Sequence, residues 1–164
     1  MISKKMQKAL NDQIGQELYS AYLYAAMAAY FEHKNLSGFA QWMTVQAQEE
    51  VGHATKFYKY LAQVQARVQF EAIAKPPADF ASPLKAFEQA YKHEQSITAR
   101  IHKLVDLACE DSDHATSVFL QWFTSEQVEE EATALDVIQK IKMVGEDSRS
   151  LYLLDRHMGS RAAK

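Results

Sequence analysis

Apolar side chains recur at alternating spacings of three and four residues through four long segments of the chain. This spacing places them on one face of an α-helix, so it predicts helices at residues 3–33, 37–64, 83–109 and 113–144. A shorter amphipathic segment at 146–158 predicts a fifth helix. Only five glycines and three prolines interrupt the 164 residues, which favours long helices.

The lengths of the connections predict how these helices are arranged. Only a few residues join the first two long helices, and also the last two, so each of these pairs must be antiparallel. The middle connection, residues 65–82, contains Pro76 and Pro77 and has no clear period. A helix of about 28 residues is about 40 Å long, and about 18 extended residues can span it. We therefore predict an all-α fold over residues 1–164: one domain, a four-helix bundle with one long crossover and a short fifth helix.

The inward-facing stripe of each long helix is interrupted near its middle by polar residues. They are Glu17 on the first helix, Glu50 and His53 on the second, Glu94 on the third, and Gln127 and Glu130 on the fourth. A single glutamate on such a stripe often means that the inward face has been assigned one residue out of register, or that the side chain reaches solvent. Interruptions at one level of four helices are much harder to explain by accident. We therefore predict that these residues form one buried polar belt.

A belt of four buried carboxylates needs something to offset its charge. Desolvation and mutual repulsion disfavour each ionised carboxylate, at a cost of several kcal/mol per unpaired ion. Protonation would relieve this, and so would two divalent cations; no basic residue lies on the stripes to do so instead. Glu50 and His53, three residues apart on one helix face, can bind one ion together. Carboxylates with one imidazole favour iron or manganese over a thiolate zinc site, so we predict such a metal site.

This set of residues resembles the ferritin-like di-iron carboxylate proteins. In that family two helices each supply one glutamate and two others each supply a Glu-x-x-His motif. Glu17 and Glu94 match the single glutamates, and "EVGH", from Glu50 to His53, matches the first motif. The fourth helix departs from the pattern, because "QVEE" at 127–130 has no histidine. That departure is similar to the non-haem bacterial ferritins, so the resemblance implies a ferritin-like bundle.

The resemblance implies an iron-storage protein with ferroxidase activity. Such a protein oxidises Fe(II) with dioxygen or peroxide and stores the ferric mineral in a hollow homo-oligomeric shell, a 24-subunit cage. The resemblance implies that Glu17, Glu50 and His53 hold one iron ion, that Glu50 bridges, and that Glu94 and Glu130 hold the second.

Further residues take roles in the same comparison. Gln127 would hydrogen-bond bound oxygen or water, or bind the metal weakly. Glu49, Glu126 and Glu129 correspond to a third iron site, although a solvated acidic face would explain them as well. Tyr24 would be either a redox-active neighbour of the irons or a core tyrosine whose hydroxyl bonds a ligand glutamate.

Related classes of protein require other sequence features. The haem-binding bacterioferritins carry a second Glu-x-x-His motif and a methionine directly after the first motif's glutamate. Here Val51 and "QVEE" stand at those places, so we expect no haem. A rubrerythrin-like peroxidase is excluded, because Cys109 is the only cysteine and a four-thiolate iron module needs four. A di-iron carboxylate oxidoreductase acting on another substrate, and a metal-free bundle that binds partner proteins, remain as alternatives.

Composition limits the classes of partner and the cellular location that we expect. The net charge is −3 with both signs interspersed, so there is no basic footprint for nucleic acid. No apolar run of about 18 residues and no signal peptide are present, which predicts no membrane partner. A single cysteine suits a reducing compartment, and we expect a cytoplasmic location.

Overall fold

The computed structural model describes residues 2–145 and 147–161, which form five α-helices and no strand. The helices are α1 (Lys4–His33), α2 (Ser37–Gln63), α3 (Pro83–Glu110), α4 (His114–Val144) and α5 (Ser148–Met158). Each bound of the four long helices lies within one residue of the prediction. Residue 146, the predicted start of α5, lies outside the described residues. The helix begins at Ser148, because the Asp147 side chain accepts hydrogen bonds from the amides of Arg149 and Ser150.

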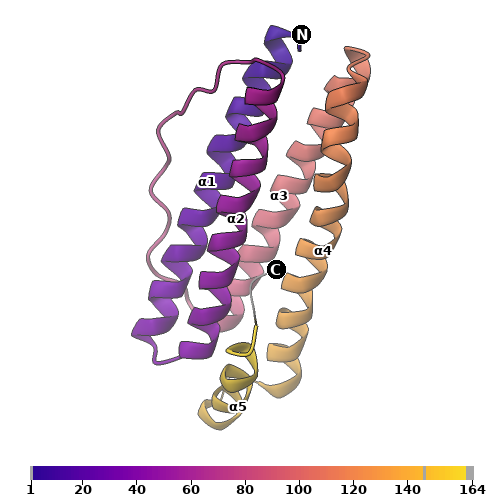
Figure 1. The fold of residues 1–164 in the computed structure, drawn as a ribbon. Coiled ribbons are helices and arrows are strands. Elements are labelled where there is room, and N and C mark those ends of the chain that lie inside the picture. Colours follow the sequence, from indigo (N-terminus) through magenta and orange to yellow (C-terminus); the bar gives the residue numbers. More distant parts are fainter. Residues whose placement is uncertain (1, 146, 162–164) are drawn as a thin grey trace.

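The helices form the predicted all-α four-helix bundle (Figure 1). Helices α1 and α2 are antiparallel neighbours, and α3 and α4 form a second antiparallel pair beside them. The connection from 64 to 82 runs back along the whole bundle, so α2 and α3 point the same way. Helix α5 lies across one end and contacts α2 and α4. None of the described helices is both long enough and apolar enough to cross a membrane.

Local sequence signals set the ends of the long helices. Ser3 caps α1 by accepting a hydrogen bond from the amide of Met6 at 3.0 Å. Ser82 caps α3 in the same way, and Pro83 occupies the first turn, where a missing amide hydrogen does no harm. Gly145, with φ of 82°, ends α4 in a backbone conformation that other residues rarely adopt.

Asn11 on α1 anchors the long connection to the bundle. Its side-chain amide donates to the carbonyl of Arg67 at 3.0 Å, and its carbonyl oxygen accepts from the amide of Gln69 at 2.7 Å. Both backbone groups lie in a segment that has no helix or strand to satisfy them. One buried side chain therefore replaces the hydrogen bonds that the crossover itself lacks.

The apolar core is divided into two clusters. One lies toward the α5 end and contains the stacked rings of Phe31 and Phe39, with centroids 5.2 Å apart. The other lies toward the opposite end and contains the stacked rings of Phe57 and Phe123, 4.1 Å apart. On every long helix the polar belt positions fall between the two clusters. Burial of these apolar side chains supplies the main stabilisation of the fold.

Helix α5 is attached to the first turn of α2. The residue before α2, Leu36, offers no side-chain cap, and Asp155 of α5 supplies one by accepting from the amide of Phe39 at 2.9 Å. The two backbones approach so closely at Gly38 that a Cβ there would lie 1.7 Å from the carbonyl oxygen of Asp155. Glycine is therefore required at this contact.

Substitution Gly38→Ala should dislodge α5 from α2. We expect the free energy of unfolding to fall by about 2 kcal/mol or more, because a methyl group cannot be placed without a backbone shift. The matched control is Gly15→Ala, at a helix position where nothing lies within 4 Å of a new Cβ. The control should be stabilised by up to about 1 kcal/mol. Denaturant unfolding measures both values, and equal stability of the two variants would contradict the close contact.

Candidate metal centre

The belt residues are drawn from all four long helices and are almost completely buried. Their exposed fractions are 1% for Glu17, 2% for Glu50, 4% for His53, 2% for Glu94, 3% for Gln127 and 4% for Glu130. The 3,4 spacing that places leucines and phenylalanines in the core also turns these polar side chains inward. Ionisable side chains this deeply buried require partners or protons.

One group of possible metal ligands combines α1 and α2. Glu17, Glu50 and His53 each offer a ligand atom, and these atoms lie within 4.8 Å of one another. The Nδ1 atom of His53 is 3.2 Å from Oε2 of Glu50. Trp122 and Phe123 of α4 pack edge-on against the imidazole, with ring centroids at 5.5 and 6.1 Å. The histidine ring is therefore held in one plane by its neighbours.

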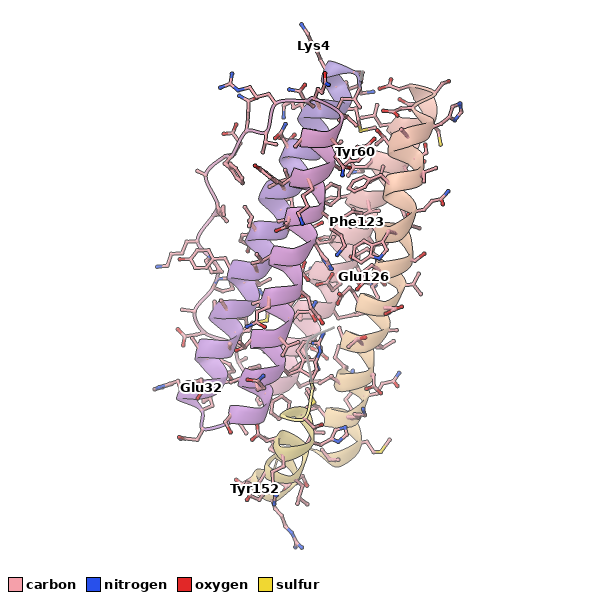
Figure 2. All side chains as sticks on the ribbon, viewed as in Figure 1. Lys4, Glu32, Tyr60, Phe123, Glu126 and Tyr152 are labelled. Carbon is pink, nitrogen blue, oxygen red and sulfur yellow. The ribbon has the colours of Figure 1, made fainter. Side chains whose placement is uncertain are left out.

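A second group shares His53 and extends toward the surface. It combines His53 with Glu126 and Glu130 of α4, again with ligand atoms within 4.8 Å of one another. Glu130 is buried, whereas Glu126 is only partly buried. Figure 2 shows Glu126 near Phe123 on α4, between the ribbons of α4 and α2. The site thus reaches the α2–α4 face of the bundle.

A cavity of about 520 Å³ opens on this α2–α4 face. Its lining residues are Gln48, Glu49, Gly52, His53, Lys56, Trp122, Glu126 and Glu129. The structure therefore brings the three predicted outer acids to one cavity beside the belt. Glu129 is exposed, which also suits a solvated acidic face, while the side chain of Glu49 is 10% exposed.

Glu94 is held by protein groups on both oxygens. The hydroxyl of Tyr24 donates to Oε1, and the amide of Gln127 donates to Oε2 at 3.1 Å. Within the described chain, Glu94 joins neither of the two ligand groups. Gln127 also lies 3.3 Å from the hydroxyl of Thr98, so its amide is fixed from two sides. Of the two roles expected for Tyr24, the hydroxyl contact with a belt glutamate is present.

Two buried glutamines support the belt and were not predicted as site residues. Gln13 donates to Oε1 of Glu17 at 2.9 Å. Gln46 donates from one nitrogen to Oε1 of Glu50 at 2.9 Å and to Oε2 of Glu130 at 2.7 Å. Each glutamine lies four residues before a belt glutamate on the same helix. This repeated Gln-x-x-x-Glu spacing is the signal in the sequence that would have revealed them.

Two buried carboxylate oxygens have no hydrogen-bond partner among the described residues. They are Oε2 of Glu17 and Oε1 of Glu130. A buried acceptor without a donor costs about 1–3 kcal/mol, and more when it is charged. Both oxygens belong to residues in the ligand groups, so a cation placed there would satisfy them.

Burial and mutual repulsion raise the pKa of every belt carboxyl. Burial raises the pKa of Glu17, Glu50 and Glu94 to about 8 and that of Glu130 to about 7. A neighbouring carboxylate adds to the shift in each case, for example Glu50 beside Glu17. Without cations the belt therefore holds protons at neutral pH, and metal ions would replace them. Burial, followed by the charge of Glu94, raises the pKa of Tyr24 well above 10, so its hydroxyl stays a donor.

The fold and site together define a helical-bundle protein with a buried carboxylate centre that can hold metal ions. The ferritin-like domain family matches residues 7–144, and the chain belongs to the ferritin family, as the sequence predicted. The general function of that family is iron storage.

Relatives cover nearly the whole chain. It is 41% identical to a bacterial non-heme ferritin of Staphylococcus aureus (strain MRSA252) over 161 residues, 98% of this chain and 97% of that protein. It is 40% identical to a bacterial non-heme ferritin of Bacteroides fragilis, over 98% of this chain and 100% of that protein.

Solved structures agree with the sequence relatives. The open-pore ferritin of the hyperthermophilic archaeon Archaeoglobus fulgidus is 49% identical, with a TM-score of 0.97 over 99% of this chain and 100% of that one. An engineered closed form of the Archaeoglobus fulgidus ferritin is 48% identical, with a TM-score of 0.98 over 100% of both chains.

The metal-free protein should lose stability as pH rises from 7 to 8.5. The raised pKa values mean that the folded belt binds protons that the unfolded chain, with glutamate pKa values near 4.5, has already released. Unfolding then releases protons, so higher pH favours it until the folded pKa is passed. Below pH 7 buried His93, whose pKa burial lowers to about 4, acts in the opposite direction.

Calorimetry of chelator-treated protein measures this dependence. We expect Tm to fall by about 5 °C or more across the window. The variant Glu17→Gln/Glu94→Gln should show a clearly flatter dependence, because two of the responsible carboxyls are gone. A Tm that rises with pH in the unsubstituted protein would contradict the proton-holding belt.

Proposed function

We propose that this chain is the subunit of an iron-storage shell that oxidises Fe(II) at the belt, with dioxygen or peroxide as oxidant. The observation that carries the proposal is the belt itself. It consists of four nearly inaccessible glutamates from four helices with one imidazole among them, and two of the carboxylate oxygens have no donor in the described part of the chain. Membership of the ferritin family supports the same function.

Fe(II) is the substrate, and the belt glutamates are its ligands. We assign Glu17, Glu50 and His53 to one ion, with Glu50 bridging to the second ion at Glu94 and Glu130. The close grouping of the first three ligand atoms supports the first position. Glu94 can serve the second while keeping its bonds to Tyr24 and Gln127, because each carboxylate oxygen has two lone pairs.

The belt brings two substrate ions to one oxidant. Each Fe(II) gives up one electron, and the pair reduces dioxygen to hydrogen peroxide, or peroxide to water. Gln127 is neutral and donates to Glu94, so we assign it to positioning that ligand rather than to strong metal binding. Tyr24 donates its hydroxyl hydrogen bond to the same carboxylate, so we assign it to positioning Glu94 as well.

A third cation site lies between the belt and the α2–α4 face. We assign Glu49, Glu126 and Glu129, which line the same cavity, to this position. Glu126 links the two regions, because its ligand atom lies within 4.8 Å of those of His53 and Glu130. We propose that ferric product leaves the belt along this acidic cavity toward the mineral.

The acidic cavity also weighs against the main alternative. A di-iron oxidoreductase acting on an organic substrate needs an apolar cavity at its metal site. Among the described cavities, the one that reaches His53 carries three glutamates on its wall. We further propose a cytoplasmic location and no bound haem, because α4 offers glutamine and glutamate where a second Glu-x-x-His motif would stand.

Loss of a belt ligand should abolish rapid iron oxidation. Glu50→Ala and His53→Ala should each lower the initial rate of Fe(II) oxidation in air by about tenfold or more, because each removes a ligand from the first position. The matched control is Glu32→Ala, an exposed acid at the end of the bundle remote from the belt (Figure 2). Absorbance of the ferric product measures the rates. Equal rates in all three variants would rule out the belt as the site of oxidation.

The assembled protein should be a large hollow shell. A 24-subunit cage of 18.7 kDa chains has a mass of about 450 kDa. Sedimentation velocity of the purified protein measures this mass directly. A monomer or dimer that still oxidises iron would instead favour the di-iron oxidoreductase.

A further inference from the structure

The chain that follows α5 brings an arginine to the outer edge of the belt. The side chain of Arg161 is 16% exposed, and its guanidinium carbon lies 4.2 Å from the ring centroid of Trp42 on α2. Its Nη2 donates to Oε1 of Gln46 at 2.8 Å and to the carboxylate of Glu49. Arg161 therefore contacts α2 at three positions spaced along one face.

The bond to Gln46 connects Arg161 to the belt. An amide has one acceptor end and one donor end, and Arg161 occupies the acceptor end. The donor end is thereby directed to Glu50 and Glu130. The arrangement recurs on the opposite side of the bundle, where Nε of Arg100 donates to Oε1 of Gln13 at 3.0 Å. Gln13 in turn donates to Glu17, so an arginine orients each supporting glutamine.

The bond to Glu49 places a permanent positive charge in the proposed third cation site. The guanidinium charge repels a metal ion that approaches the same carboxylate. The Nη1 atom of Arg161 is buried and has no hydrogen-bond partner within the described part of the chain. The guanidinium is thus held mainly by Glu49, Gln46 and the face of Trp42. A metal ion at Glu49 would have to compete with it.

We propose that Arg161 is the counter-ion of Glu49 in the third cation site, which Glu49 forms with Glu126 and Glu129. The charge of Arg161 weakens cation binding at this site, so that the two belt positions fill first. The inference rests on the proposed function, because it concerns filling of the same centre. It also links the two regions. A cation that displaces Arg161 from Glu49 frees the acceptor end of Gln46 and so loosens Glu50 and Glu130. Arrival of an ion at the outer site would therefore favour release of product from the belt.

The experiment is calorimetric titration of the metal-free assembly with Zn(II), which binds carboxylates and histidine without redox chemistry. Four proteins are compared: the unsubstituted chain, Arg161→Ala, Arg161→Lys and Arg156→Ala. Arg156 is exposed on α5, and Arg156→Ala removes the same charge, so this variant is the matched control. We expect Arg161→Ala to bind the weakest of three ions about tenfold more tightly. That is the effect of removing a unit charge about 6 Å from a dication in a water-like dielectric.

Arg161→Lys keeps the charge, so its third ion should bind within about threefold of the affinity of the unsubstituted chain. The third ion of Arg156→Ala should also bind with the affinity of the unsubstituted chain. An unchanged or weaker third ion in Arg161→Ala overturns the proposal, as does the absence of a third ion from both proteins. A merely structural role for Arg161 would weaken all three ions together. If the unsubstituted chain binds no tight pair of ions, the proposed function itself fails; if it binds the pair and oxidises iron, only this inference is at stake.

Discussion

The structure is organised around the burial of four carboxylates at the middle of its core. No isolated carboxylate is stable there as an anion, because burial removes its hydration and each neighbour repels it. Both effects raise the pKa values of Glu17, Glu50, Glu94 and Glu130. The bundle resolves it by placing an apolar cluster on each side of the belt, so that the ends supply the stability that the middle lacks.

The belt is asymmetric, and the asymmetry follows from the two helix pairs. The α1–α2 side offers an imidazole, whereas the α3–α4 side offers oxygens and the amide of Gln127. His53 is also the residue shared by both ligand groups, so it lies where the belt turns toward the α2–α4 face. In the proposed path, a cation that moves outward would exchange Glu17 for Glu126 while it keeps His53 as a ligand. The "QVEE" segment thus supplies a glutamate and an amide to the centre where a second Glu-x-x-His motif would supply an imidazole.

The fold could be predicted from the sequence because the apolar residues recur at helical spacing. Helix bounds, antiparallel pairs and the crossover all follow from spacing and connection length, and so does the inward direction of the belt residues. Arg100 and Arg161 could not be found in this way, because each acts on the belt through a glutamine on another element. Arg161 in addition lies beyond the last helix, where no period exists. The start of α5 at Ser148 likewise depends on one local side chain, the Asp147 cap, rather than on a periodic pattern.

Helix α2 is the element through which distant parts of the chain reach the centre. Its first turn receives the Asp155 cap at Gly38 and Phe39, its middle receives Arg161, and the next turn carries Glu50 and His53. The attachment of α5 therefore decides where the tail arginine lies. The contacts of α5 with Gly38 and Phe39, and those of Arg161 with Gln46 and Glu49, are thus all made with this one helix. The short helix thus has two roles: its Leu154 and Met158 join the apolar cluster at that end of the bundle, and it leads into the segment in which Arg161, the proposed counter-ion, contacts Glu49.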